Sequence, residues 1–310
     1  MPPPDTEAVG RLGQAEGFAL VGVCDAIPRG GGGLRAWLAA GRNGTMSYME
    51  RNIEARIDPR ILVPGAKSII CVADRYPGMK PEDECEGGLI ARYARGDDYH
   101  RVIKRRLHAM CDAMRADAPE FVYRACVDTA PIMERQHAAA AGLGAIGRNT
   151  LLISPSIGSW MLLGAIVTTL PLQATKPIDD DPCGSCTRCI DACPTGAISD
   201  GSVNARLCIS YLTIEHRGDI DLSVQDSMGR WVFGCDVCQE VCPHNAPTER
   251  TIASHTNPAY DGRDASLDVR EVMDWTEDDR LAAFRGSAMK RAKLDMIRRN
   301  AAIVAANNGV

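Results

Sequence analysis

The sequence of 310 residues is poor in aromatic side chains, which make up 5% of it, and it has no long apolar run. The longest apolar stretch, Trp160 to Leu170, is about half of the ~20 residues needed to cross a bilayer. The N-terminus lacks a basic region followed by an apolar run, so we expect no targeting segment and a cytoplasmic protein. Positive charge is not in excess, because 35 Lys and Arg face 40 Asp and Glu. This balance argues against a protein that is basic over its whole surface.

Cysteine, by contrast, is abundant. The chain has 13 cysteines, and most of them fall between residues 183 and 242. Because the total is odd and the chain is long, the pattern does not fit a short disulfide-rich secreted protein. Clustered thiols in a reducing compartment indicate metal binding instead. With 45% hydrophobic and 24% charged residues, the chain can bury a sizeable core, and its length allows about two domains.

The first half of the chain has the patterns of a mixed α and β fold. Apolar runs predict strands at residues 18–24, 67–73 and 121–127, and helical spacing of apolar residues predicts a helix over 99–114. Residues 128–131 resemble the start of a further helix. Residues 173–182 suit a linker, and residues 276–310 are helical in character.

Residues 142–147 match the pattern G-x-G-x-x-G of dinucleotide-binding sites. That function requires a strand before the glycines and a helix after them. Here a helix-like, alanine-rich segment comes first, so the glycines predict a loop that ends a helix. Gly30 to Gly33 predict a flexible loop and carry little indication of a phosphate site.

The cysteine spacing identifies an iron–sulfur segment. Residues 183–194 form C-x2-C-x2-C-x3-C-P, the run found in bacterial ferredoxins, whose fourth cysteine ligates the other cluster when there are two. Residues 235–243 repeat the end of that pattern, and Cys208 can supply the missing early ligand. Two four-thiolate [4Fe-4S] sites then account for all eight cysteines: Cys183, Cys186, Cys189 and Cys242 in one, and Cys193, Cys208, Cys235 and Cys238 in the other.

Zinc is the alternative, because paired C-x2-C motifs also form tetrathiolate zinc sites. Zinc does not explain the triple cysteine run or the proline after each last cysteine. The five other cysteines (Cys24, Cys71, Cys85, Cys111, Cys126) have no ligand spacing, and we expect Cys24, Cys71 and Cys126 to be buried in or beside strands. A segment with two clusters transfers electrons, so the chain is either a reductase with its own acceptor site or an electron-transfer protein.

Motifs along the whole chain resemble those of the epoxyqueuosine reductases, cobalamin-dependent iron–sulfur enzymes of tRNA queuosine synthesis. The resemblance covers roughly residues 9–305 and is not confined to the cysteines. It is carried by the segments 43–51, 62–68, 91–100, 127–135, 142–150, 158–160, 209–215, 234–240, 285–288 and 299–302.

The resemblance implies an α+β fold with an N-terminal α/β cobalamin-binding domain (1–175), a ferredoxin-like domain with two [4Fe-4S] clusters (176–250) and a C-terminal helical segment (251–310). It implies reduction of the epoxide of epoxyqueuosine at the tRNA wobble position to the alkene of queuosine, with cobalamin as cob(II)alamin or cob(I)alamin. That reaction takes two electrons and two protons and releases water. The implied partners are the tRNA and a reduced flavodoxin- or ferredoxin-type electron donor, with the protein as a monomer.

Asp128 matches the aspartate that the family is proposed to use as proton donor to the epoxide oxygen. Considered alone, an aspartate before Thr-Ala-Pro is a candidate helix cap. As a proton donor it must be protonated near neutral pH, which requires burial or a negatively charged neighbour. By motif position, the expected cobalamin contacts are Arg51, Arg92, Tyr93, Asp128, Leu152, Leu163, Ser210 and Asp236. Arg92 could instead pair with Asp97 or Asp98, and the two leucines could belong to the core.

Two segments carry local positive charge despite the acidic total. Residues 92–106 hold six Lys or Arg against two Asp, and residues 285–299 hold six against one. Phosphate contact follows from such charge, although a solvated helix face is an equal alternative. The expected tRNA contacts are Arg217, Lys290, Arg291 and Lys293. Two other functions stay open: a reductive dehalogenase-like cobalamin enzyme, which would typically carry a twin-arginine signal, and a non-catalytic iron–sulfur protein.

Overall fold

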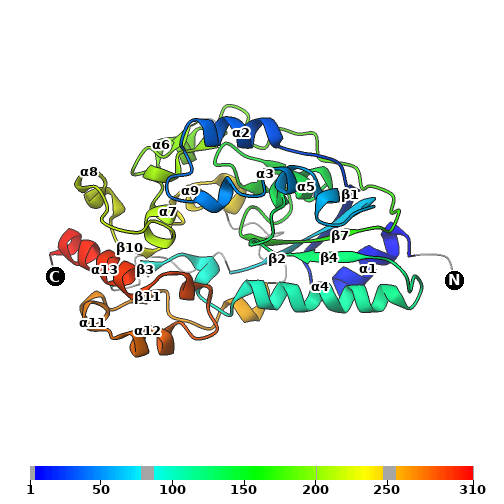
Figure 1. Ribbon diagram of the computed structural model, residues 1–310. Coiled ribbons are helices and arrows are strands. Elements are labelled where there is room, and N and C mark those ends of the chain that lie inside the picture. The colour runs from blue at the N-terminus through cyan, green and yellow to red at the C-terminus, as the bar shows by residue number, and fades with distance from the viewer. Residues whose placement is uncertain (1–3, 78–86, 200, 247–255, 310) are drawn as a thin grey trace.

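The computed structural model describes residues 4–77, 87–199, 201–246 and 256–309 (Figure 1). An antiparallel sheet of four strands lies at the centre of the first half of the chain. Its strand order is β1 (Leu20–Asp25), β2 (Ser68–Arg75), β7 (Met161–Thr168) and β4 (Tyr123–Cys126). Every residue of β2 is buried, as expected for a central strand with packing on both faces. The strands predicted at 18–24, 67–73 and 121–127 are therefore confirmed, with ends that differ by a few residues.

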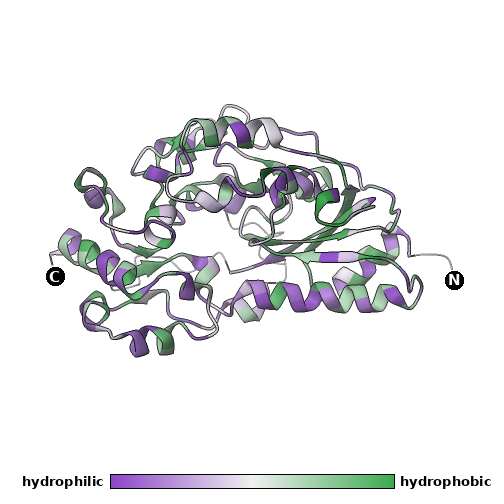
Figure 2. Ribbon diagram, in the orientation of Figure 1, coloured by the Kyte–Doolittle hydropathy of each residue, from purple (hydrophilic) through white to green (hydrophobic). Residues whose placement is uncertain are grey.

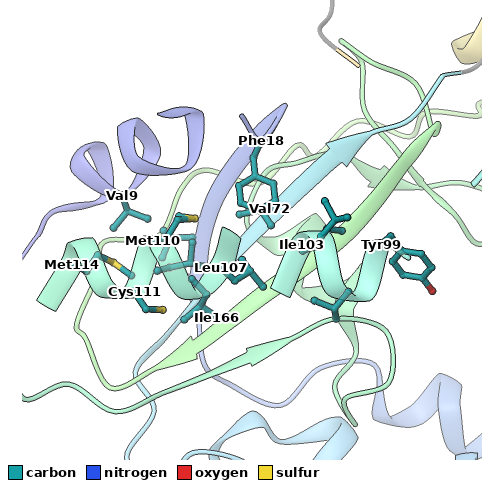
Figure 3. Packing of buried hydrophobic residues seen from close by; sticks show 14 of the residues in the cluster. Val9, Phe18, Val72, Tyr99, Ile103, Leu107, Met110, Cys111, Met114 and Ile166 are labelled. Carbon is teal, nitrogen blue, oxygen red and sulfur yellow. The ribbon is translucent and has the colours of Figure 1, made fainter. Parts of the chain in front are cut away.

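Helices cover both faces of this sheet (Figure 1). On one face lie α1 (Thr6–Ala15) and α4 (Tyr99–Arg115), so the helix predicted over 99–114 is confirmed. Figure 2 shows hydrophilic and hydrophobic residues alternating along α4, as expected for a helix with one buried side. Ile103, Leu107 and Met110 of α4 pack against Val72 and Ile166 of the sheet (Figure 3).

The second face of the sheet is apolar as well, and the predicted buried cysteines belong to it. Cys24, Cys71 and Cys126 are each at most 1% exposed and share a core cluster with residues of α5 (Glu134–Ala140). Above this face lie α2 (Gly31–Ala39) and α3 (Ile53–Ile57). Cys111 of α4 is buried in the core cluster on the first face of the sheet, whereas Cys85 lies outside the described residues.

The segment after β4 differs from its prediction. The helix expected from residue 128 begins only at Glu134, and its N-cap position is Met133 rather than Asp128. Asp128 has a φ of 52°, in the left-handed region, so the chain makes a turn there instead of entering a helix. After α5, Gly142 has a φ of 78° and a two-stranded ribbon follows, β5 (Ala145–Ile146) with β6 (Leu152–Ile153). The glycines of 142–147 thus form the predicted helix-ending loop.

The iron–sulfur segment and the C-terminal segment lie beside the sheet domain, at the left of Figure 1. The first contains short elements: α6 (Arg188–Asp191), β8 (Ile198–Ser199), β9 (Ser202–Val203), α7 (Ile209–Ile214), α8 (Leu222–Gln225) and α9 (Val237–Glu240). The second contains α11 (Val269–Asp274), α12 (Glu277–Ala283) and α13 (Leu294–Asn308), which confirms the helical character expected for residues 276–310. Within the described ranges, none of the helices combines the length and the apolar character needed to cross a membrane.

A second, three-stranded sheet joins segments that are far apart in the sequence. Its central strand β3 (Gly88–Ile90) pairs in parallel with β10 (Trp231–Phe233) and antiparallel with β11 (Ser266–Leu267). Each strand comes from a different one of the three predicted domains. The domain boundaries at 175 and 250 stay a prediction.

A buried carboxylate fastens the C-terminal segment to the first sheet. Asp74 of β2 forms an ion pair with Arg106 of α4 and accepts hydrogen bonds from Asn257 Nδ2 at 2.9 Å and Tyr260 OH at 2.8 Å. Asp74 and Arg106 are both buried. A charge in such a place is stable only while its partners remain.

We expect Asp74→Ala to lower the stability by about 3–5 kcal/mol, because it leaves the Arg106 guanidinium buried without its carboxylate. The measurement is the apparent Tm of thermal unfolding. Asp112→Ala is the control, since it breaks an exposed pair with Arg115 on the same helix and should cost less than about 1 kcal/mol. Equal Tm values for the two variants would contradict this account.

Candidate functional site

A large cavity lies where the sheet domain, the iron–sulfur segment and the C-terminal segment meet. Its volume is about 2230 Å³, well above the ~300–1,000 Å³ of an ordinary small-molecule site. The lining comes from β4 and β7, from the turn between β4 and α5, from one side of α4, and from residues within the segment 30–56. Residues 201–203, 214–217 and 288–293 close it from the side of the other two segments.

The cavity wall is strongly basic. Its Lys and Arg side chains far outnumber its acidic ones, Asp98, Asp128, Glu134 and Glu215. The basic residues are Arg51, Arg56, Arg101, Lys104, Arg115, Arg124, Arg135, Arg217, Lys290, Arg291 and Lys293. Because the whole chain has a net charge of -5, this wall concentrates positive charge in one place, and a polyanion would be attracted to it.

Half of the residues expected to contact cobalamin line this cavity, and so does every residue expected to contact tRNA. The first group is Arg51, Tyr93, Asp128 and Leu163, and the second is Arg217, Lys290, Arg291 and Lys293. They come from segments up to 242 positions apart in the sequence, between residues 51 and 293.

The other four expected cobalamin contacts lie outside the cavity lining. Leu152 is in the core beside α5, the alternative that its sequence left open. Ser210 is in the first turn of α7, where its backbone N–H reaches the Cys208 thiol. Arg92 and Asp236 are both buried where the sheet domain touches the iron–sulfur segment.

Arg92 and Asp236 hold these two parts of the chain together. Asp236 Oδ2 accepts a hydrogen bond of 2.7 Å from the backbone N–H of Arg92. The Arg92 guanidinium pairs with Glu240 Oε1 at 2.6 Å and lies 4.8 Å from the centre of the Trp160 ring. Burial raises the pKa of Asp236 to about 6, although the bond from Arg92 opposes the shift. The ion pair of Arg92 is thus with Glu240, and not with Asp97 or Asp98.

Asp128 lies in the cavity wall, on a turn that hydrogen bonds with neighbouring side chains hold in place. Its backbone N–H donates to Glu134 Oε1 at 2.7 Å, and its Oδ2 accepts from Tyr99 OH at 3.0 Å. His100 Nε2 lies 3.1 Å from the same oxygen. The side chain keeps 60% of its surface exposed, so a molecule in the cavity can reach it. Asp128 does not cap a helix.

The protonation of Asp128 depends on His100 and Tyr99, which contact its carboxyl group. Burial acts to raise the pKa of Asp128, but the hydrogen bond and charge of His100 and the bond from Tyr99 hold it below the ordinary value. Burial of the His100 ring acts to lower its pKa, but the bonds to Asp128 and Asp98 raise it to about 9. Burial, and next the charge of Asp128, raises the pKa of Glu134 to about 8. At neutral pH these shifts favour a proton on His100 rather than on Asp128.

The sequence predicts no role in the site for three residues: Tyr99, His100 and Glu134. The first two belong to the segment 91–100 and Glu134 to the segment 127–135, both of which carry the family resemblance. Asp98 two positions before His100 was a usable signal, because an N-cap aspartate can also hold a side chain of the first helical turn. Nothing in the spacing links His100 to Asp128, which is 28 residues away.

Neighbouring thiols can be identified within both expected sets of cysteines, and the ligand sets themselves stay a prediction. Cys183, Cys186, Cys189 and Cys242 line one small cavity. For the second set, burial and the charge of Cys193 raise the pKa of Cys208, and burial and then the charge of Cys238 raise that of Cys235. Backbone N–H groups of Arg148 and Ala197 lie 3.3 Å from Cys183 Sγ and Cys193 Sγ, bonds that tune thiolate ligands.

Among the described residues, no three His, Cys, Asp or Glu side chains are grouped closely enough to be recognised as ligands of one metal ion. The preference for [4Fe-4S] clusters over zinc rests on the cysteine spacing.

The two basic segments of the sequence each divide between the core and the cavity. Arg106 pairs with Asp74, and Arg299 donates to the carbonyl oxygens of Leu212 and His216. Arg101 and Lys104 of the first segment line the cavity, as do Lys290, Arg291 and Lys293 of the second. Exposed basic residues of both segments thus line the cavity, and their contact with phosphate stays a prediction.

Comparisons with known proteins agree on one family. The family described as "Epoxyqueuosine reductase QueG, DUF1730" matches residues 56–129, and the "4Fe-4S double cluster binding domain" matches residues 182–245. The epoxyqueuosine reductase of Cyclobacterium marinum is 40% identical to this chain, over 95% of each.

Solved structures give the same result. An epoxyqueuosine reductase with an epoxyqueuosine-modified tRNA-Tyr stem loop has a TM-score of 0.87 and 28% identity, covering 97% of this chain and 80% of that one. An epoxyqueuosine reductase from Bacillus subtilis, with the catalytic loop that carries an aspartate swung out of its active site, has a TM-score of 0.86 and 28% identity, covering 97% and 81%. From its similarity over nearly the whole length, the chain belongs to the epoxyqueuosine reductase family.

Proposed function

We propose that this protein reduces the epoxide of epoxyqueuosine in tRNA to the alkene of queuosine. The observation that carries the proposal is the single cavity in which Asp128, a basic wall and the iron–sulfur segment come together. Each part has its use: an acid–base group for the epoxide oxygen, cations for phosphates, and clusters for electrons. The relative with a bound epoxyqueuosine stem loop supports the same substrate for this chain.

The proposed cluster ligands are Cys183, Cys186, Cys189 and Cys242 for one [4Fe-4S] site and Cys193, Cys208, Cys235 and Cys238 for the other. The support is that the first four line one small cavity, and that burial, and also the nearby Cys208 and Cys193, raise the pKa of Cys238. The two sets interleave, because Cys193 follows the first run and Cys242 follows the second. Each cluster would therefore bind both ends of the segment 183–242.

We expect Cys183→Ala and Cys208→Ala each to lose about half of the roughly eight iron atoms of the reconstituted protein, because each removes a ligand of a different cluster. Iron analysis after anaerobic reconstitution measures the loss. Cys111→Ala is the matched control, since that thiol is buried in the core and should leave the iron content unchanged. Full iron in either ligand variant would refute the assignment.

Cobalamin fits the cavity by size and lining. The volume of about 2230 Å³ leaves room for a cofactor of that size together with a nucleotide, and Arg51, Tyr93 and Leu163 are the expected residues that would hold it there. When bound, cobalamin supplies the redox chemistry that opens the epoxide. The other expected contacts lie outside the cavity lining and would act indirectly, by holding the iron–sulfur segment and the core in place around the cofactor. They are Arg92, Leu152, Ser210 and Asp236.

Asp128 is the proposed acid–base residue. Its carboxyl group is exposed to the cavity, and its backbone lies in a sparsely populated conformation, which is frequent at functional sites. The Bacillus subtilis relative has a catalytic loop that bears an aspartate and can leave the active site, which supports a similar role for the turn at Asp128. In the reaction, Asp128 would hold a proton next to the epoxide oxygen and release it as that oxygen leaves as water.

We expect Asp128→Asn to slow turnover by on the order of 10²–10⁴-fold, the usual loss when an acid–base group is removed. Asparagine tolerates the left-handed backbone as aspartate does, so clusters and cofactor should stay bound. The assay is mass analysis of epoxyqueuosine-containing tRNA after anaerobic reconstitution, and loss of one oxygen must require cobalamin.

Asp112→Asn, an exposed change on α4 outside the cavity lining, is the control and should retain full turnover. Wild-type turnover by Asp128→Asn would exclude the catalytic role. Unchanged tRNA with wild-type protein, intact clusters and cobalamin would exclude the function itself.

The tRNA would bind along the basic wall through Arg217, Lys290, Arg291 and Lys293. These side chains lie on the iron–sulfur and C-terminal side of the cavity, opposite the sheet domain. Arg291 is also paired with Glu215 at 2.6 Å, and Lys290 with Asp98, so the wall is held in place before RNA arrives.

We expect tRNA affinity to fall steeply with added salt, because binding releases counterions from the phosphates. Lys293→Gln should weaken binding and reduce the slope of log K against log salt by about one unit. Lys176→Gln, in the linker outside the cavity, is the control. An affinity that does not respond to salt would rule out phosphate contact.

The remaining parts of the proposal concern organisation. A reduced flavodoxin- or ferredoxin-type protein would deliver electrons to the clusters, and the protein would act as a cytoplasmic monomer. Its division into segments 1–175, 176–250 and 251–310 would separate cofactor binding, electron transfer and support of the tRNA wall.

A further inference from the structure

His100 lies between two carboxylates at the wall of the cavity. Its Nδ1 is 2.7 Å from Asp98 Oδ1, and its Nε2 is 3.1 Å from Asp128 Oδ2. A carboxylate can only accept a hydrogen bond, so each ring nitrogen must carry a hydrogen to make both bonds. The geometry therefore selects the imidazolium form of His100.

Asp98, the first of the two carboxylates, is held in a fixed position. It is the N-cap of α4, where its Oδ1 also accepts from the backbone N–H of His100 at 3.1 Å. Its Oδ2 pairs with Lys290 from the C-terminal segment, and its side chain is 1% exposed. The ring of His100 stacks on Tyr99 with 4.0 Å between ring centres, which holds its plane.

Asp128 receives both of its side-chain hydrogen bonds at one oxygen. Tyr99 OH and His100 Nε2 each reach Oδ2, and no hydrogen bond from the residues that the structure describes reaches Oδ1. Oδ1 is thus the oxygen left to a molecule in the cavity. A half turn of the carboxyl group exchanges the two oxygens at low cost, because this torsion is broad and two-fold.

The stoichiometry of the reaction makes this arrangement useful. Removing the epoxide oxygen as water takes two electrons and two protons: both C–O bonds break, the oxygen gains two hydrogens, and the C=C bond forms. A single carboxyl group can hold one proton at a time. Asp128 must therefore be protonated again between the two transfers.

We propose that His100 is a positioning residue that supplies the protons for this reaction through Asp128, by passing its Nε2 proton to the carboxyl group and regaining one from solvent. The inference rests on the proposed function, and it adds the source of the protons. Asp98 holds the ring in place and stabilises its charge, and the 28% exposure of the side chain gives water access for recharging.

Titratable and charged groups from every neighbouring element bear on this ring. They are Asp98 and Lys290, Asp128, and, farther off, Glu134 and Arg291. The pKa of His100 is about 9, above its ordinary value, so the imidazolium is the main form at neutral pH and is lost as the pH rises through about 9. The rate should therefore fall on the alkaline side near that pH.

The kinetic test compares wild type with His100→Gln in the reconstituted holoenzyme, acting on epoxyqueuosine-containing tRNA. Glutamine can donate a hydrogen bond but has no proton to give. We expect kcat to fall on the order of 10²-fold at pH 8. The alkaline limb should move from near pH 9 to below about pH 7, because Asp128 would then titrate alone.

If His100 had only a structural role, kcat would fall by the same factor at every pH and the alkaline limb of the pH profile would stay in place. That result would overturn the proposal.

The second measurement needs neither tRNA nor turnover of the cofactor. It is an NMR titration of histidine-labelled protein, in which the His100 signal is assigned from the His100→Gln spectrum. We expect a titration near pH 9 in wild type and at lower pH in Asp128→Asn.

Titration of His100 at or below about pH 6.5 in wild type would also overturn the proposal. Should wild type fail to convert the tRNA, the proposed function fails and the NMR result still decides the state of His100. Should wild type convert it while His100→Gln keeps an unchanged profile, only the inference about His100 fails.

Discussion

The buried carboxylate of Asp98 is the group on which the arrangement of the site depends. One side chain caps α4, fixes the ring of His100 and pairs with Lys290 of the C-terminal segment. Because α4 packs over the central strands, the cap ties the core of the sheet domain to the cavity wall. Losing this carboxylate would release a helix end, a catalytic neighbour and part of the basic wall together.

A similar logic applies where the sheet domain meets the iron–sulfur segment. The Arg92 guanidinium is held by Glu240 and by the face of Trp160, while its backbone N–H holds Asp236. Trp160 and Asp236 are buried and Glu240 is partly buried, and buried polar groups without partners are costly. The iron–sulfur segment is therefore held in one position next to the cavity. Electron transfer from the clusters requires such a fixed distance.

Several features could be predicted from the sequence because their signals are local. The apolar run of residues 67–73 predicts a buried strand. The spacing of the cysteines predicts two sets of four thiols. The turn at Asp128 could not be predicted, because a left-handed φ at a residue other than glycine follows from its surroundings. The pKa of Asp128 could not be predicted either, since it depends on His100, which approaches only through the fold.

The short strands illustrate the same limit. β3, β10 and β11 have two or three residues each, too few for a periodic pattern, and they pair across more than 140 residues of chain. This pairing sets an order of events during synthesis. β3 leaves the ribosome long before either partner, so its edges stay open until residues 231–233 and then 266–267 have followed. The cysteines of residues 183–242 all emerge before the last of these strands, so the chain presents them for cluster insertion before its second sheet can close.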